Sequence, residues 1–118
     1  RDIVYVNAHG TGTPMNDVLE TAAIKKALGE DNAKKAYVSS TKSMTGHMLG
    51  AAGAIDALAC LFALNESIIP PTIKLREQDE ACDLNCVPNT AVKAGITLAL
   101  SNSLGFGGHN ACLAFRKV

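Results

Sequence analysis

The chain lacks tryptophan, and only two tyrosines and three phenylalanines occur among its 118 residues. It also lacks an excess of charge, because 11 basic residues balance 11 acidic ones. A nucleic-acid-binding domain usually shows clustered basic residues, often interleaved with aromatic ones, and this sequence has no such pattern. We therefore predict that nucleic acid is not a partner.

Long uninterrupted hydrophobic segments are also missing. The most apolar stretch, residues 48–64, is short and contains Asp56, so we expect no membrane span. The N-terminal residues carry no secretory signal pattern. The chain starts at Arg1 and leads straight into a strand pattern, which indicates a piece of a longer cytoplasmic protein.

The four cysteines do not have the spacing of a metal site. Cys82 and Cys86 lie in an irregular segment without a second pair or a suitably placed histidine, so we predict no metal. Cys60 lies in the apolar stretch and Cys112 in a strand pattern, and we expect both to be small core residues. Unpaired cysteines of this kind are typical of a reducing, cytoplasmic environment.

The residue patterns predict an α/β fold in which helices pack on a mixed sheet. Apolar and β-branched runs between turn residues predict four strands, at 2–7, 37–40, 95–102 and 111–117. The last two strands are separated by a short turn and should pair antiparallel. Helical patterns cover 17–28 and 48–64. Residues 30–35 and 65–89 are expected to be irregular, and a single domain is expected over 1–118.

The first predicted helix has a recognisable start and end. Asp17 and Glu20 have the spacing of a capping box, and Gly29 follows the last helical residue. The face expected to point inward consists of small and aliphatic residues: Val18, Leu19, Ala22, Ala23 and Leu28.

Residues 39–64 change from a polar loop to an apolar helix, and His47 falls at the boundary. At a helix N-terminus the unpaired N–H groups and the helix dipole disfavour positive charge, so we expect a neutral imidazole. Such a group can donate a hydrogen bond to a carbonyl oxygen that gains negative charge. The alternative is that His47 is only a cap or a packed polar residue. Asp56 needs a buried partner, and Lys42 is the nearest candidate.

Three polar, glycine-containing segments each follow a predicted strand, namely AHGTGTP at 8–14, STKSMTGH at 40–47 and SLGFGGHN at 103–110. Parallel strands place such loops along one sheet edge, where ligands bind in open α/β sheets. We therefore expect a binding site at which four side chains converge: His9, Lys42, His47 and Phe106. The glycine spacing fits neither a phosphate-binding Walker loop nor a dinucleotide fingerprint.

At these segments the sequence resembles a known family. AHGTGTPMND at 8–17, SSTKSMTGHMLGAAGAID at 39–56, PPT at 70–72 and NSLGFGGHN at 102–110 are similar to the C-terminal half of the β-ketoacyl-acyl-carrier-protein synthases, most closely the type II elongating branch. The resemblance implies half of a thiolase-like fold, with three αβα layers. It also implies an acyltransferase that condenses a malonyl thioester with an acyl-enzyme thioester, with loss of carbon dioxide, in fatty acid elongation. Family members are usually cytoplasmic homodimers that need no cofactor beyond the phosphopantetheine of the acyl carrier protein, their partner.

The resemblance implies catalytic roles for three residues. His9 and His47 match the two active-site histidines, which donate hydrogen bonds to the malonyl thioester carbonyl. Lys42 matches the family lysine beside the second histidine and is expected to be held by Asp56, where many relatives have glutamate. Glu20 matches a second acid, with a structural role.

Other matching positions imply substrate binding. Thr11 and Thr13 match residues that bind the phosphopantetheine arm. Phe106, with Gly107 and Gly108, matches the mobile loop that gates the site. The nucleophilic cysteine of the family lies in the N-terminal half, so we expect the isolated chain to be inactive. Three alternatives stay open at this point: a non-catalytic partner subunit of the chain-length-factor type, a polyketide ketosynthase, and an α/β domain that binds some other anionic ligand.

Overall fold

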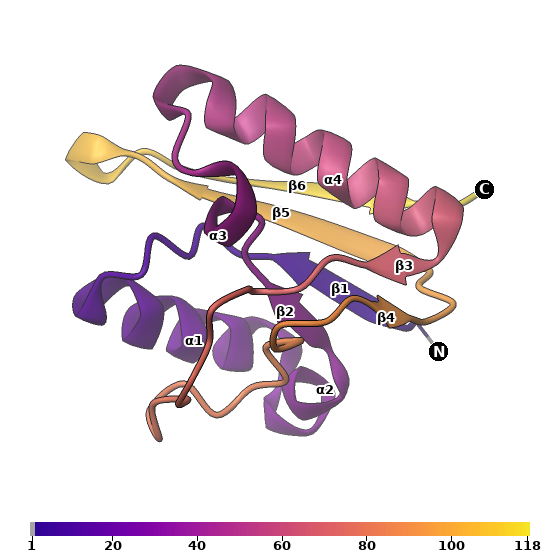
Figure 1. Cartoon of the computed structure of the whole chain (residues 1–118), viewed down its shortest axis with the longest axis horizontal. Coiled ribbons are helices and arrows are strands. Elements are labelled where there is room, and N and C mark those ends of the chain that lie inside the picture. Colours follow the sequence, from indigo (N-terminus) through magenta and orange to yellow (C-terminus); the bar gives the residue numbers. More distant parts are fainter. Residues whose placement is uncertain (1) are drawn as a thin grey trace.

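The computed structural model describes residues 2–118, and Arg1, where the predicted domain begins, lies outside the described residues. Along the chain the elements are β1 (Val4–Asn7), α1 (Pro14–Leu28), α2 (Glu30–Lys35), β2 (Tyr37–Ser39), α3 (Lys42–Thr45), η1 (Leu49–Ala51), α4 (Ala52–Glu66), β3 (Ile68–Ile69), β4 (Val92–Lys93), β5 (Leu98–Leu104), η2 (Phe106–Gly108) and β6 (Asn110–Arg116) (Figure 1).

The main sheet is mixed, as predicted, with strand order β2-β1-β5-β6. The strands β2, β1 and β5 run parallel, whereas β6 pairs antiparallel with β5 from Leu98↔Arg116 to Leu104↔Asn110. The predicted C-terminal hairpin is therefore confirmed. A second, two-stranded sheet joins β3 and β4. Because three strands are parallel, the loops after β1, β2 and β5 leave the main sheet at the same edge.

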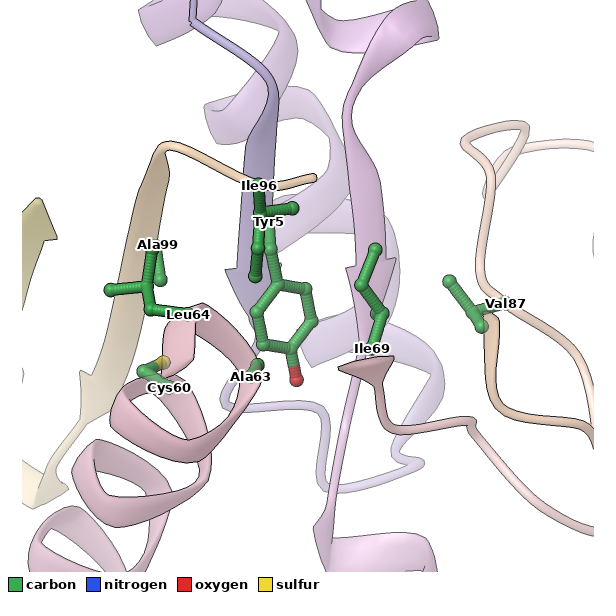
Figure 2. Packing of buried hydrophobic residues seen from close by; sticks show 8 residues of the cluster. All are labelled: Tyr5, Cys60, Ala63, Leu64, Ile69, Val87, Ile96 and Ala99. Atoms are coloured by element: carbon green, nitrogen blue, oxygen red, sulfur yellow. The ribbon is translucent and has the colours of Figure 1, made fainter. Parts of the chain in front are cut away.

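Helices cover both faces of the main sheet, which gives the predicted three layers (Figure 1). Successive strand residues point to opposite faces. Tyr5 packs toward α4 with Cys60, Leu64 and Ile69, and Figure 2 shows its ring lying between the helix and Ile69. On the other face, Val6 packs in a second cluster completed by Ile24, Ala33, Val38 and Leu84.

The predicted details of the first helix are partly wrong. The helix α1 begins at Pro14, with Thr13 at the N-cap position and no side-chain cap. Proline is favoured in the first turn because its missing N–H would be unpaired there. Glu20 takes no part in a capping box, since its carboxylate is used elsewhere, as described below.

The inward face of α1 was also predicted wrongly. Ile24 and Glu20 are its buried residues, and Leu28 packs against the second cluster. The other predicted core residues, Val18, Leu19, Ala22 and Ala23, are exposed. Glu20 and Ile24 are four residues apart, one helical turn, so together they define the stripe that contacts the sheet.

Two short helices lie where irregular chain was predicted. Residues Glu30–Lys35 form α2, with acidic residues in its first turn and basic residues in its last. That charge order complements the helix dipole and was a usable signal. The helix α3 lies inside the predicted polar loop, whereas the first residues of the helix predicted at 48–64 form the separate 3₁₀ turn η1. Consequently α4 begins at Ala52, and His47 does not stand at its N-terminus as predicted.

The helix α4 is buried on one face only, although its sequence is apolar on nearly all sides. Asp56, Cys60 and Ala63 face the sheet, whereas Leu61 and Phe62 are 46% and 65% exposed. By length and composition alone, the segment Leu49–Glu66 is apolar enough to cross a membrane, with a mean hydropathy of 1.4. Core helices pass the same test, and here α4 packs on β5 with a charged residue inside.

Candidate active site

Two imidazoles meet at the sheet edge where the parallel strands end. His9 follows β1, and His47 follows β2 after the short helix α3. Their ring centroids are 5.6 Å apart, and the ring planes are at 87° to one another. The predicted proximity of the two histidines is thus confirmed, although they lie 38 positions apart in the sequence.

The backbone at His9 is held by a buried carboxylate. Glu20 is 5% exposed, and it accepts hydrogen bonds from the backbone N–H groups of His9 (2.8 Å, to Oε1) and Gly10 (3.0 Å, to Oε2). The side chains of Asn102 and Asn16 each donate a further bond of 3.3 Å, one to each oxygen. A carboxylate with this many donors is well compensated for its burial. Glu20 therefore ties the His9 loop to α1 and β5.

The loop after β1 packs closely against the chain that follows β2. Gly10 has φ of +45°, and a Cβ built on it would stand 2.4 Å from the Cβ of Ser40. No side chain fits there, so glycine is required both by conformation and by space. The Ser40 hydroxyl donates to the carbonyl of Gly10 (3.1 Å). This contact brings the two histidine-bearing loops together.

A buried ion pair lies beneath the loops. The Lys42 Nζ is 2.6 Å from Asp56 Oδ2, and both side chains are almost fully buried. The predicted pairing is confirmed, and the shorter aspartate side chain reaches the lysine directly. Thr41 donates to the other oxygen, Asp56 Oδ1 (3.1 Å), and Asn7 donates to the Asp56 backbone carbonyl (3.2 Å). The desolvation cost of burying this ion pair is offset because both carboxylate oxygens of Asp56 accept hydrogen bonds.

The two imidazoles have different surroundings. His47 Nδ1 accepts the N–H of Leu49 (3.0 Å), so in the neutral ring the proton is on Nε2. His9 Nδ1 is buried without a hydrogen-bond partner among the described residues. Burial, followed by the charge of Lys42, lowers the pKa of His9, while Glu20 acts in the opposite direction. The neutral His47 ring therefore presents an Nε2–H donor, and the lowered pKa of His9 favours its neutral form.

A cavity of about 500 Å³ opens beside His47, between α1, the two histidine-bearing loops and residues 72–86. Lys42, His47 and the loop residues Thr11 and Gly12 line its polar part. Its remaining wall includes aliphatic and thiol groups from Ile24, Val38, Ile73, Leu75, Cys82 and Cys86. The hydroxyls of Thr11 and Thr13, both exposed, lie 3.2 Å apart, and of the two only Thr11 lines the cavity.

The structure does not bring Phe106 to the histidines, contrary to expectation. Phe106 lies in η2 at the tip of the β5–β6 hairpin with Gly107 and Gly108, and it is 99% exposed. Nothing in the described residues covers this tip. Cys112 is also exposed, so its predicted place in the core is wrong, whereas Cys60 is fully buried as expected. The described residues contain no group of histidine, cysteine or acidic side chains able to hold a metal ion.

Sequence reasoning missed Asn7, Thr41 and Ser40 as parts of the site. All three are buried polar residues. A usable signal existed, because each is a polar residue at or just after the end of a predicted strand and within two residues of His9 or Lys42.

Comparison with known proteins identifies this arrangement. The family model of the β-ketoacyl synthase C-terminal domain matches residues 1–76, more than half of the chain. The chain belongs to the β-ketoacyl synthase family. Curated relatives named 3-oxoacyl-[acyl-carrier-protein] synthase 2 are 52% identical over 114 residues (Vibrio harveyi), 56% over 115 (Synechocystis sp.) and 54% over 117 (Staphylococcus aureus). The match covers 97–99% of this chain but only 27–28% of each relative.

Solved β-ketoacyl synthase structures have the same fold. A β-ketoacyl synthase from Burkholderia phymatum superposes with a TM-score of 0.90 at 37% identity. The ishigamide ketosynthase/chain length factor gives 0.92 at 42%, and a type II polyketide ketosynthase in complex with its acyl-carrier protein gives 0.94 at 39%. Each match covers 99% of this chain and 28% of the other. The predicted thiolase-like α/β fold is confirmed, but the chain spans little more than a quarter of the length of such proteins and not half of it.

Proposed function

We propose that this chain is the C-terminal portion of a 3-oxoacyl-[acyl-carrier-protein] synthase of type 2, and that it supplies the groups that activate the malonyl substrate. The observation that carries the proposal is the pair of imidazoles, whose ring centroids are 5.6 Å apart, with the Nδ1 of His47 already used as an acceptor so that its Nε2–H is left to donate. The identity of 52–56% to relatives of that name supports the choice of reaction.

Decarboxylation is the step to which the histidines contribute. When the bond between the malonyl α-carbon and its carboxylate breaks, carbon dioxide leaves and the electron pair passes into an enolate. Negative charge then develops on the thioester oxygen. Two preorganised N–H donors stabilise that charge without reorganising at the moment of reaction. The lowered pKa of His9 keeps its ring neutral at working pH, as a donor that does not itself give up a proton.

Condensation completes the proposed reaction. The enolate carbon attacks the carbonyl of an acyl thioester held on a cysteine, a carbon–carbon bond forms, and the cysteine thiolate leaves. Burial raises the pKa of Cys60 to about 12 and also raises the pKa of Cys86 and Cys112, the reverse of what a nucleophile needs. The family resemblance places the nucleophilic cysteine outside this segment, so we assign the nucleophile to the remainder of the protein.

The proposed partner is an acyl carrier protein, which would deliver the malonyl group on its phosphopantetheine arm. A relative 39% identical to this chain is described in complex with an acyl-carrier protein, which supports this partner. The cavity beside His47, with Thr11 at its polar end, offers a path for the arm. No resident cofactor is proposed.

A second candidate is a role in a polyketide synthase, either as a ketosynthase or as its chain-length-factor subunit. Structural relatives described as ketosynthase/chain length factor and as a type II polyketide ketosynthase support it, at 42% and 39% identity. The curated synthase 2 relatives have higher identities, and retention of both histidines argues against a non-catalytic subunit.

The test uses the full-length protein with His9→Ala and His47→Ala. Each variant should lose about 10²- to 10³-fold in malonyl-thioester decarboxylation, the usual effect of removing one oxyanion donor. Transfer of an acyl group onto the enzyme should persist. His109→Ala is the matched control, because His109 is exposed in the hairpin loop. Undiminished decarboxylation in both histidine variants rejects the assigned roles, and a full-length protein that cannot be acylated favours the chain-length-factor candidate.

A further inference from the structure

We propose that Thr41 is a positioning residue for the reaction: its hydroxyl fixes the Asp56 carboxylate so that Lys42 stays fixed beside the histidine pair. The inference rests on the proposed function. It is carried by a hydrogen-bonded unit that joins β1, α3 and α4, formed by Asn7, Thr41, Lys42 and Asp56.

The two oxygens of Asp56 have separate partners. Lys42 Nζ bonds Oδ2 at 2.6 Å, and Thr41 Oγ1 donates to Oδ1 at 3.1 Å. Among the described residues, the Thr41 hydroxyl is the hydrogen-bond donor to Asp56 Oδ1. Without the hydroxyl, Asp56 could turn about its side-chain bonds and carry Lys42 with it. The side chains of Thr41, Lys42 and Asp56 are all buried, so solvent water would not replace the missing hydrogen bond.

Thr41 also connects the unit to the strand that leads to His9. Asn7 Nδ2 donates to Thr41 Oγ1 (3.2 Å) and to the Asp56 backbone carbonyl (3.2 Å), and the Thr41 N–H donates to Asn7 Oδ1 (3.4 Å). His9 is two residues beyond Asn7, and His47 is five beyond Lys42. The unit therefore links the two segments on which the imidazoles stand.

Lys42 is close enough for its position to matter to the histidines. Its charge is the second cause of the lowered pKa of His9, after burial, and it lines the same cavity as His47. The other titratable groups near Asp56 are Tyr5 and Cys60, and burial raises the pKa of both, so they are neutral at working pH. Lys42 and Asp56 are thus the charged pair whose geometry Thr41 controls.

The test compares Thr41→Val with Thr41→Ser in the full-length protein. Valine keeps the shape and removes the donor, whereas serine keeps the donor. Thr41→Val should lower kcat for malonyl-thioester decarboxylation by about tenfold or more, with KM unchanged within about twofold, because orientation and not binding is lost. Thr41→Ser should retain most of the rate. Thr97→Val is the matched control, since Thr97 is exposed, lies immediately before β5 and donates a similar bond to the carboxylate of Asp2.

A double-mutant cycle keeps the inference testable if valine also lowers stability. In an Asp56→Asn background, Thr41→Val should cause little further loss of kcat, because the shared interaction is already broken. Equal losses in the serine and valine variants, or additive losses in the cycle, would overturn the inference in favour of simple packing. The proposed function fails separately, through undiminished decarboxylation in the His9→Ala and His47→Ala variants.

Discussion

Replacing Glu20 by glutamine should displace the His9 loop, although the two side chains have the same shape. Each carboxylate oxygen of Glu20 accepts from one backbone N–H and one asparagine amide: His9 and Asn102 at Oε1, Gly10 and Asn16 at Oε2. A glutamine amide has only one oxygen. Whichever way it turns, its NH₂ group faces two donors, so two hydrogen bonds are lost and donors oppose one another.

The size of the effect follows from these contacts. Hydrogen bonds to a charged group contribute about 1.5–3 kcal/mol each, so losing two in a buried site should cost about 3–6 kcal/mol. Depending on how the amide turns, the same change removes the bond to the backbone N–H of His9 (2.8 Å) or to that of Gly10 (3.0 Å), and either loss loosens the loop. We therefore expect Glu20→Gln to lower both stability and the rate of decarboxylation, the latter by about tenfold or more because a small misplacement of a donor is costly.

The assay is thermal unfolding of the full-length protein, with decarboxylation kinetics on the same samples. Glu20→Gln should lower the Tm by about 5 °C or more. Glu80→Gln, the same change at an exposed turn residue, should leave the Tm and the rate essentially unaltered. If Glu20→Gln behaves like Glu80→Gln, the carboxylate is not what holds the loop.

Three further results are expected. Gly10→Ala should lower the free energy of unfolding by about 2–5 kcal/mol, because its Cβ would stand 2.4 Å from Ser40, and Ser40→Gly should restore part of this loss. Gly12→Ala is the control, since Gly12 also has a positive φ but faces open space, and it should cost less. Equal costs at the two positions would disprove the steric explanation. The pKa of His9 is lowered in the fold, so its stabilisation is full above the unfolded value of about 6.5 and declines as the pH falls toward the folded pKa. The Tm advantage of the wild type over His9→Gln should therefore shrink between about pH 7.5 and about pH 5.5, and a constant difference would contradict this. Cys60, fully buried and with a pKa of about 12, should resist iodoacetamide in the native protein and react after denaturation, as mass spectrometry would show; rapid native labelling would refute its burial.

Local patterns predicted the four strands of the main sheet well, because such strands depend on short apolar runs between turn residues, but they missed the two-residue strands β3 and β4. The parallel arrangement of β1, β2 and β5 placed the loops after them at one edge, and the meeting of His9 and His47 followed from that arrangement. The resemblance to a family supplied the proposed roles. The pairing of Lys42 with Asp56 was predicted from chemistry alone, because a buried carboxylate requires a partner.

The faces of the helices were predicted less well. The pattern of α1 indicated an apolar face at Val18 and Leu19, yet the buried residues are Glu20 and Ile24. A carboxylate with four donors can be buried more favourably than its polarity suggests, and only the folded arrangement supplies those donors. In α4 the sequence is apolar all round, so its composition could not indicate which side would face the sheet.

By itself, the sequence determined the order of the four strands of the main sheet and the two long helices, the three polar loops and the two histidines. These depend on local backbone preferences and on the side chains of each segment. Only the tertiary structure decided that Glu20 accepts a hydrogen bond from the His9 backbone, that Thr41 bonds Asp56 Oδ1, and that Phe106 is exposed to solvent. The physical reason is that hydrogen-bond partners and burial are set by groups distant in the sequence, which no local pattern contains.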